Sequence, residues 1–277
     1  MTGRNNHRAF SIIELIVCMF IIVALISLML PAIAAGRSAA RRSQCLNNMK
    51  QIGLGIYNYE SAHRVLPPGV VNETGPIQNT PDGLHLGWII QLLPYMEQSA
   101  LSLSIDTTAS VYETGNRGVG ATRLNTLICP EDGKAASLAG IGVSSFAGCH
   151  HDVEAPIDVD NHGVFFLNSR VRMADVLDGT STTIFVGEKI IEPGDLGWMS
   201  GTRATLRNTG TALNAKTPAS ALRSDFHVGG FASRHPGGAN FCFGDGSVRF
   251  LSDTINLDVF RYLGNRDDGE PVADRPF

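Results

Sequence analysis

A histidine and an aspartate near the C-terminus, His235 and Asp245, are separated by nine residues. An imidazole beside a carboxylate can act as a general base or hold a ligand. Each residue also suits a structural role, since a histidine can be held by hydrogen bonds and Asp-Gly is typical of a tight hairpin turn. We predict the structural roles, with Gly246 completing the turn of a hairpin over residues 235–251. Its inward side chains would form one core face: Phe241, Phe243, Val248 and Phe250.

Residues 149–162 contain many side chains of the types that bind metals. They are Cys149, His150, His151, Asp152, Glu154, Asp158, Asp160 and His162. Zinc sites usually carry paired ligands at defined spacing, and the sequence contains neither CxxC nor HExxH. The stretch from Asp158 begins like a calcium loop, but its twelfth position is Ser169, where an EF-hand has glutamate. We therefore predict a solvated polar loop without a tight metal site; calcium is the one cofactor left open.

The sequence lacks G-x-S-x-G, a Walker loop and a dinucleotide-binding fingerprint. Its net charge is −4 over 277 residues, which is not typical of a nucleic-acid-binding protein. Gly187-Glu188 ends a predicted strand with an inward-pointing acid, whose partner the sequence does not identify. We predict no enzymatic activity and no nucleic-acid partner.

Four of the five cysteines, Cys45, Cys129, Cys149 and Cys242, lie outside the N-terminal apolar run. Disulfides would be possible if this part of the chain were exported. We prefer Cys129–Cys149 because these two are close in the sequence, although spacing alone leaves the connectivity open.

An apolar run begins at Phe10, continues to residue 30 and contains one acid, Glu14. As a helix, residues 10–35 would measure about 39 Å, enough to span a bilayer. An ionised carboxylate inside a membrane helix costs roughly 2.5–3.5 kcal/mol. A cut between Ala9 and Phe10 would create an α-amino group that could neutralise Glu14 of an adjacent subunit. Such a helix favours assembly over the isolated subunit.

Residues 36–65 are predicted to continue this helix as a stem. Apolar side chains follow one face at 4-3-4-3 spacing: Cys45, Met49, Ile52, Ile56 and Tyr59. We expect this stripe to pack on the globular part of the chain. Gly53 and Gly55 each cost about 1 kcal/mol in a helix interior, so we expect the stem to bend or loosen there.

Residues 66–277 are predicted to form a β-rich globular domain, because the 30 glycines and 13 prolines of the chain indicate many turns. We expect strands at residues 164–167 and 182–186, a buried strand or turn at residues 88–95, and a long loop at residues 193–224. The predicted fold class is α+β, with the long N-terminal helix packed on an antiparallel sheet.

The N-terminus resembles type IV prepilins and type II secretion pseudopilins. Their pattern is a short basic leader, a small residue, Phe-x-x-x-Glu and a long apolar helix, matched here by residues 1–9, Ala9, Phe10 and Glu14. Ala9 stands where that pattern usually has glycine. His235 with Asp245-Gly246 resembles the H-X9-DG signature of a large group of bacterial pseudopilin-like proteins.

This resemblance implies a pilin-like fold and a structural role. A prepilin peptidase would cut before Phe10, and the subunit would polymerise through its N-terminal helix into a pilus or pseudopilus. Its partners would be copies of itself or other pseudopilins, and an inner-membrane assembly platform. It would cross the inner membrane once, with the C-terminal domain in the periplasm or at the cell surface.

Two alternatives share the same N-terminal features. An ordinary secretory signal would be cleaved after Ala32-Ile33-Ala34, and an uncleaved anchor would keep the leader. An exported enzyme or carbohydrate-binding domain could also use a pilin-type anchor, with a site at His235, Asp245 or residues 150–162.

Overall fold

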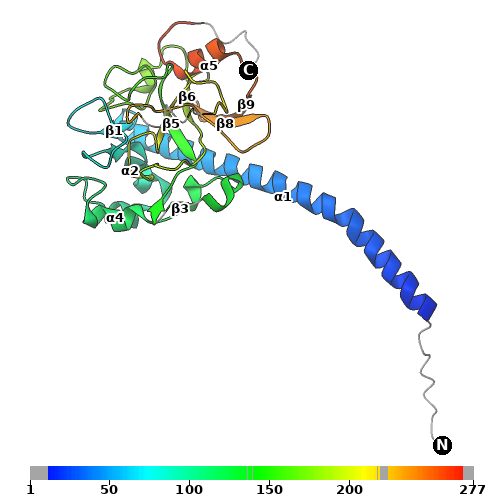
Figure 1. Cartoon of the computed structure of the whole chain (residues 1–277). Helices are drawn as coiled ribbons and strands as arrows, with labels where there is room; N and C mark the ends of the chain where they lie inside the picture. The colour runs from blue at the N-terminus through cyan, green and yellow to red at the C-terminus, as the bar shows by residue number, and fades with distance from the viewer. Residues whose placement is uncertain (1–11, 136, 139, 217, 219–223, 271–277) are drawn as a thin grey trace, which may run out of the picture. The chain divides into compact units, whose positions relative to one another are not determined.

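The computed structural model describes residues 12–135, 137–138, 140–216, 218 and 224–270 (Figure 1). The chain divides into two compact units, Met1–Ser43 and Gln44–Phe277. The predicted cleavage residues Ala9 and Phe10 lie outside the described residues, as does the rest of the leader.

Helix α1 (Ile12–His63) has 52 residues and runs from the first unit into the second. Its segment Ile12–Leu30 is long and apolar enough to cross a membrane, by length and composition. Almost all side chains of this segment are exposed, Glu14 among them. The expected loosening at Gly53 and Gly55 does not occur, because the helix is continuous through both residues.

The two glycines allow close packing in the second unit. A Cβ on Gly53 would lie 2.8 Å from Cys242 Sγ, and one on Gly55 would lie 3.0 Å from Met96 Cγ. The predicted apolar stripe of the stem is confirmed, since its five side chains are at most 8% exposed. The helix is thus held by close packing, which compensates for the poor helix propensity of glycine.

A five-stranded sheet forms the centre of the second unit, in the order β7-β5-β6-β8-β9. The strands are β5 (Phe146–His151), β6 (Ile184–Glu188), β7 (Leu206–Asn208), β8 (Gly238–Phe243) and β9 (Val248–Ser252). All neighbours are antiparallel except β5 and β7, which are parallel. The α+β class is confirmed, and the sheet is mixed where a purely antiparallel one was predicted.

The sheet is covered on both faces. Cys242 on β8 belongs to the same core as the α1 stem, whereas its neighbours Phe241 and Phe243 pack in a second core with helix α5 (Leu257–Gly264). Val248 is paired with Cys242 across the hairpin and packs against the α1 core. The predicted single face is therefore wrong, because alternate residues of a strand point to opposite sides of the sheet.

The remaining elements are short. Two small ladders pair β1 (Val70–Val71) with β2 (Leu86–Gly87), and β3 (Ser137–Leu138) with β4 (Ile141–Gly142). The helices are α2 (Trp88–Leu92), α3 (Ser99–Ser102) and α4 (Thr114–Gly120), with 3-10 turns η1 (Leu93–Met96), η2 (Asn125–Leu127), η3 (Pro130–Ala135) and η4 (Met173–Asp175).

Three predicted segments differ from the structure. Residues 88–95 are helical, and Trp88 is anchored by an indole N–H that donates to the Thr205 carbonyl at 2.9 Å. Residues 164–167 form no strand, since the N–H groups of Val164 and Phe165 both donate to the Cys149 carbonyl. The predicted loop at 193–224 contains β7, and residues 198–209 are buried.

Candidate functional site

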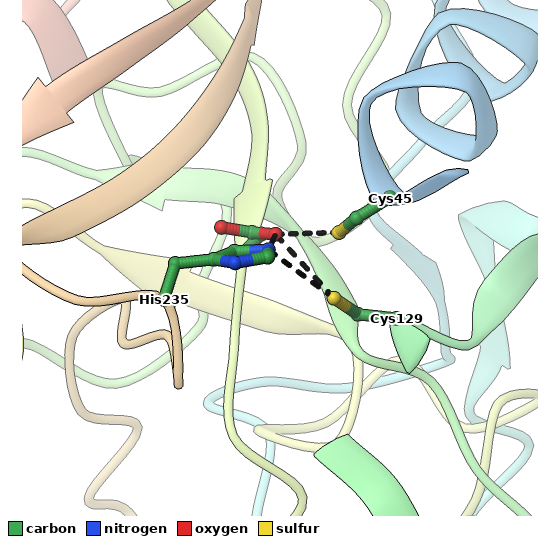
Figure 2. A group of neighbouring side chains, drawn as sticks. Cys45, Cys129 and His235 are labelled. Carbon is green, nitrogen blue, oxygen red and sulfur yellow. Dashed lines mark hydrogen bonds and ion pairs between the residues drawn. The ribbon is translucent and has the colours of Figure 1, made fainter. Parts of the chain in front are cut away.

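Four side chains from distant parts of the sequence meet beside the α1 stem. Cys45 lies on α1, Cys129 follows η2, Glu188 ends β6 and His235 precedes β8. Figure 2 shows Cys45, Cys129 and His235 pointing toward one another. All four residues are at most 5% exposed. We refer to these four residues as the dithiol cluster.

Glu188 Oε1 is the shared acceptor of the dithiol cluster. The Cys45 thiol donates to it at 2.6 Å and the Cys129 thiol at 3.7 Å, while His235 Nε2 lies 3.2 Å away. Cys129 Sγ is also 3.5 Å from His235 Nε2. One ligand atom from each side chain lies within 4.8 Å of the other three.

Backbone groups hold the cluster from outside. The Asn240 N–H donates to Glu188 Oε2 at 2.7 Å, which leaves Oε1 facing the two thiols and the imidazole. The backbone N–H of Glu131 donates to the Cys129 sulfur. The His235 N–H donates to Ser233 Oγ at 3.1 Å, fixing the loop that presents the imidazole.

The packing of these groups shifts their pKa values strongly. Hydrogen bonds to Cys129 and Glu188 raise the pKa of His235 to about 10. The hydrogen bond from Cys45 lowers the pKa of Cys129 to about 7, against the effect of burial, and the same bond raises the pKa of Cys45. Burial opposes ionisation of Glu188, but hydrogen bonds from His235, Asn240 and Cys45 hold its pKa below the usual value.

This combination of groups allows two kinds of chemistry. Thiolates, an imidazole and a carboxylate are the ligands that zinc prefers in proteins. Two neighbouring thiols can alternatively be oxidised to a disulfide. Substrate catalysis would require access to side chains that are at most 5% exposed.

His235 and Asp245 of the H-X9-DG signature have separate partners. His235 contacts Cys129 and Glu188, whereas Asp245 accepts from the Ser247 N–H at 2.8 Å within the hairpin turn. Arg249 lies 3.5 Å from the other Asp245 oxygen. Gly246 has φ of +79°, as expected for the predicted turn.

Residues 150–162 form a different polar network. His150 is fully buried and bonds Asn161 at 3.0 Å, and His151 is 8% exposed, so the predicted solvated loop is wrong for this part. Asp152 Oδ1 contacts both His151, at 2.6 Å, and His162, at 3.1 Å. His162 is exposed, and so are Val159 and Asp160.

The two cysteines of the predicted disulfide, Cys129 and Cys149, are both free thiols in the structure. Cys129 belongs to the dithiol cluster. Cys149 lies in the second core, which packs with helix α5, and its sulfur is 3.6 Å from the Gly264 carbonyl oxygen. Sequence proximity was a poor guide because the two residues face different layers of the fold.

Two members of the cluster were not recognised as site residues from the sequence. The sequence places Cys45 only in the apolar stripe, and it indicates Glu188 as an inward-pointing acid without identifying a partner. Both descriptions are correct locally. Their partners come from segments far away in the chain, so no spacing rule connects them.

The geometry defines an α+β protein in which a long N-terminal helix contributes a thiol to a buried polar cluster. The family described as protein of unknown function (DUF1559) matches residues 34–258, and the chain belongs to this family. The match includes the whole cluster and Asp245-Gly246, and it begins after the apolar segment Ile12–Leu30. No curated protein and no solved structure matches the chain.

Proposed function

We propose that this chain is a structural pilin-type subunit, which enters the bacterial inner membrane through its N-terminal helix and assembles through that helix into a pilus-like filament or a secretion pseudopilus. The observation that carries the proposal is the division of α1 into two parts. The apolar side chains of Ile12–Leu30 are exposed, whereas the stripe from Cys45 to Tyr59 is buried in the second unit.

Lipid or other helices must cover the exposed apolar segment, because water around so many apolar side chains is unfavourable. Passing from lipid to a bundle of neighbouring helices leaves these side chains in an apolar environment throughout. Association is then driven by packing and by polar pairs, since lipid tails are as apolar as leucine. A helix of this composition can therefore move from membrane to filament without exposing its apolar surface to water.

Glu14 supplies the polar pair in this proposal. It lies at the start of the apolar segment and, after a cut before Phe10, would be the fifth residue of the mature chain. The new α-amino group of one subunit would neutralise Glu14 of its neighbour. Partners are accordingly copies of this chain or other pseudopilins, together with prepilin peptidase and an inner-membrane assembly platform that provides the force.

Mass measurement of the protein extracted from its native membrane tests the proposal. Intact mass and peptide mapping should show a chain that starts at Phe10, and deletion of the prepilin peptidase should leave the leader in place. A chain starting at Ala35 would indicate an ordinary secretory signal and contradict the proposal. A leader retained in the wild-type cell would indicate an uncleaved anchor, which leaves no N-terminal ammonium at Phe10.

A further inference from the structure

We propose that the dithiol cluster is a structural zinc site that fastens the α1 stem to the sheet. Its ligands are Cys45, Cys129 and His235, which are labelled in Figure 2, together with Glu188. The inference is independent of filament assembly, because it concerns the fold of Gln44–Phe277 alone.

Three distances between ligand atoms agree with the edges of a zinc tetrahedron. With bonds of about 2.3 Å to sulfur and about 2.0–2.1 Å to nitrogen or oxygen, ligand atoms stand roughly 3.3–3.8 Å apart. The three contacts among Cys129, His235 and Glu188 Oε1 measure 3.5, 3.7 and 3.2 Å. The Cys45–Glu188 contact of 2.6 Å is shorter, and this edge opens by about 1 Å when the ion enters.

The burial of the cluster favours an ion at its centre. The buried Glu188 carboxylate needs a compensating positive charge, which His235 supplies at 3.2 Å when no ion is bound and a divalent cation can supply in its place. On binding, each thiol and His235 release a proton to solvent, so the cysteines bind as thiolates and His235 as the neutral imidazole. A divalent cation then faces two thiolates and one carboxylate, which neutralises most of the buried negative charge.

The surrounding hydrogen bonds suit a metal centre. Asn240 holds Glu188 Oε2 and leaves Oε1 to coordinate, and the Glu131 N–H supports the Cys129 sulfur. Such outer contacts fix the orientation of metal ligands. Four protein ligands complete the coordination of zinc and leave no open position, so the site is structural and not catalytic.

The position of the site explains what the ion does. It joins the α1 stem, the segment between η2 and η3, the end of β6 and the loop before β8. A single ion thereby cross-links four segments that are far apart in the sequence. The histidine of the H-X9-DG signature is one of these links, while its Asp-Gly pair shapes the adjoining hairpin.

Zinc content of the full-length chain in detergent tests the site. Purified wild type should carry about one equivalent, and Cys129→Ser and His235→Ala should retain at least tenfold less after dialysis, since each lacks one of four ligands. Cys242→Ser is the matched control, because Cys242 is an equally buried free thiol outside the cluster. His162→Ala controls for the polar network around Asp152. Both controls should keep their zinc.

Cobalt substitution of the wild-type chain gives a test that does not depend on whether the variants fold. Bound Co²⁺ should show tetrahedral d–d bands and a thiolate charge-transfer band, and chelation should lower the melting temperature. Chelation should also make Cys45 and Cys129 more reactive to alkylation than Cys242.

A wild-type chain without stoichiometric zinc, or without the Co²⁺ bands, overturns the proposal. A Cys45–Cys129 disulfide in the native protein overturns it as well. Zinc loss from His162→Ala in place of His235→Ala would assign the metal to the other network.

Discussion

Glu154 is a single carboxylate that holds three parts of the second unit together. It accepts hydrogen bonds from the N–H groups of Val228 and Gly229, at 2.9 and 3.0 Å, and from Asn208 at 2.8 Å. His227 lies 3.1 Å away. Burial opposes its ionisation, but these hydrogen bonds and the nearby histidine hold the pKa of Glu154 below its usual value. The anionic form therefore stabilises the fold.

Neutralising this carboxylate should reduce stability and change its dependence on pH. Because the pKa is lower in the folded chain, the contribution is complete above the unfolded pKa and is lost as the pH falls through the folded one. We expect Glu154→Gln to lose roughly 1–2 kcal/mol near neutral pH and less in acid, since solvent screens part of the effect at a partly exposed side chain. Melting temperatures of the wild type and of Glu154→Gln from neutral to acidic pH measure the difference.

Asp160→Asn, at an exposed acid in the same segment, is the control. A difference in melting temperature between wild type and Glu154→Gln that stays constant with pH would contradict this role of Glu154.

Gly246 is the residue that permits the hairpin turn. Its φ of +79° is unfavourable for a β-branched residue, and a Cβ here would lie 3.3 Å from Tyr57 on α1. We expect Gly246→Val to destabilise the chain by about 1–3 kcal/mol, measured as a lower melting temperature. Gly118→Val is the control, since a Cβ at Gly118 meets nothing within 4 Å. Equal melting of both variants would mean that the turn does not limit stability.

The buried stripe of α1 fixes the stem on the sheet. Ile52 is fully buried, whereas Leu54 on the other side of the same helix is 61% exposed. A charge at position 52 would be buried without a partner, so we expect Ile52→Asp to cost about 3–5 kcal/mol. Leu54→Asp should leave the melting temperature nearly unchanged. Similar losses in both variants would show that charge on the stem, and not burial of its stripe, causes the effect.

Elements with a local pattern could be predicted from the sequence, and those decided by distant partners could not. The stem is visible in the spacing of residues 45–59, and the hairpin in Asp245-Gly246. Strand β7 has three residues and no pattern of its own; it exists because it pairs with β5 in parallel. Residues 164–167 have strand composition, but the Cys149 carbonyl accepts the N–H groups of Val164 and Phe165. Tertiary contacts override local propensity in both cases.

The same division applies to the candidate site. The signature singled out His235, and a predicted strand end identified Glu188 as an inward-pointing acid. The connection between them required the sheet, because β6 and β8 are neighbours only in the folded chain. Cys45 joins through helix packing across the sheet face. The residue types were therefore visible in the sequence, while the site they form depends on the whole domain.

Glu14 is expected to act in assembly and not in folding. Glu14→Gln lowers the cost of placing this position in lipid, roughly 2.5–3.5 kcal/mol for an ionised carboxylate, so membrane insertion should be unimpaired. The unit Gln44–Phe277 does not include this position and should melt as in the wild type. Filament yield should fall, because the incoming subunit no longer attracts the Phe10 ammonium of its neighbour, an attraction that lipid screens far less than water does.

The measurement is sheared or crosslinked filament per inserted chain. Ser27→Ala, which removes a hydroxyl that bonds the backbone of the same helix, is the control and should assemble normally. Normal yield from Glu14→Gln would remove the charge-pairing mechanism, and loss of insertion would assign Glu14 to an earlier step.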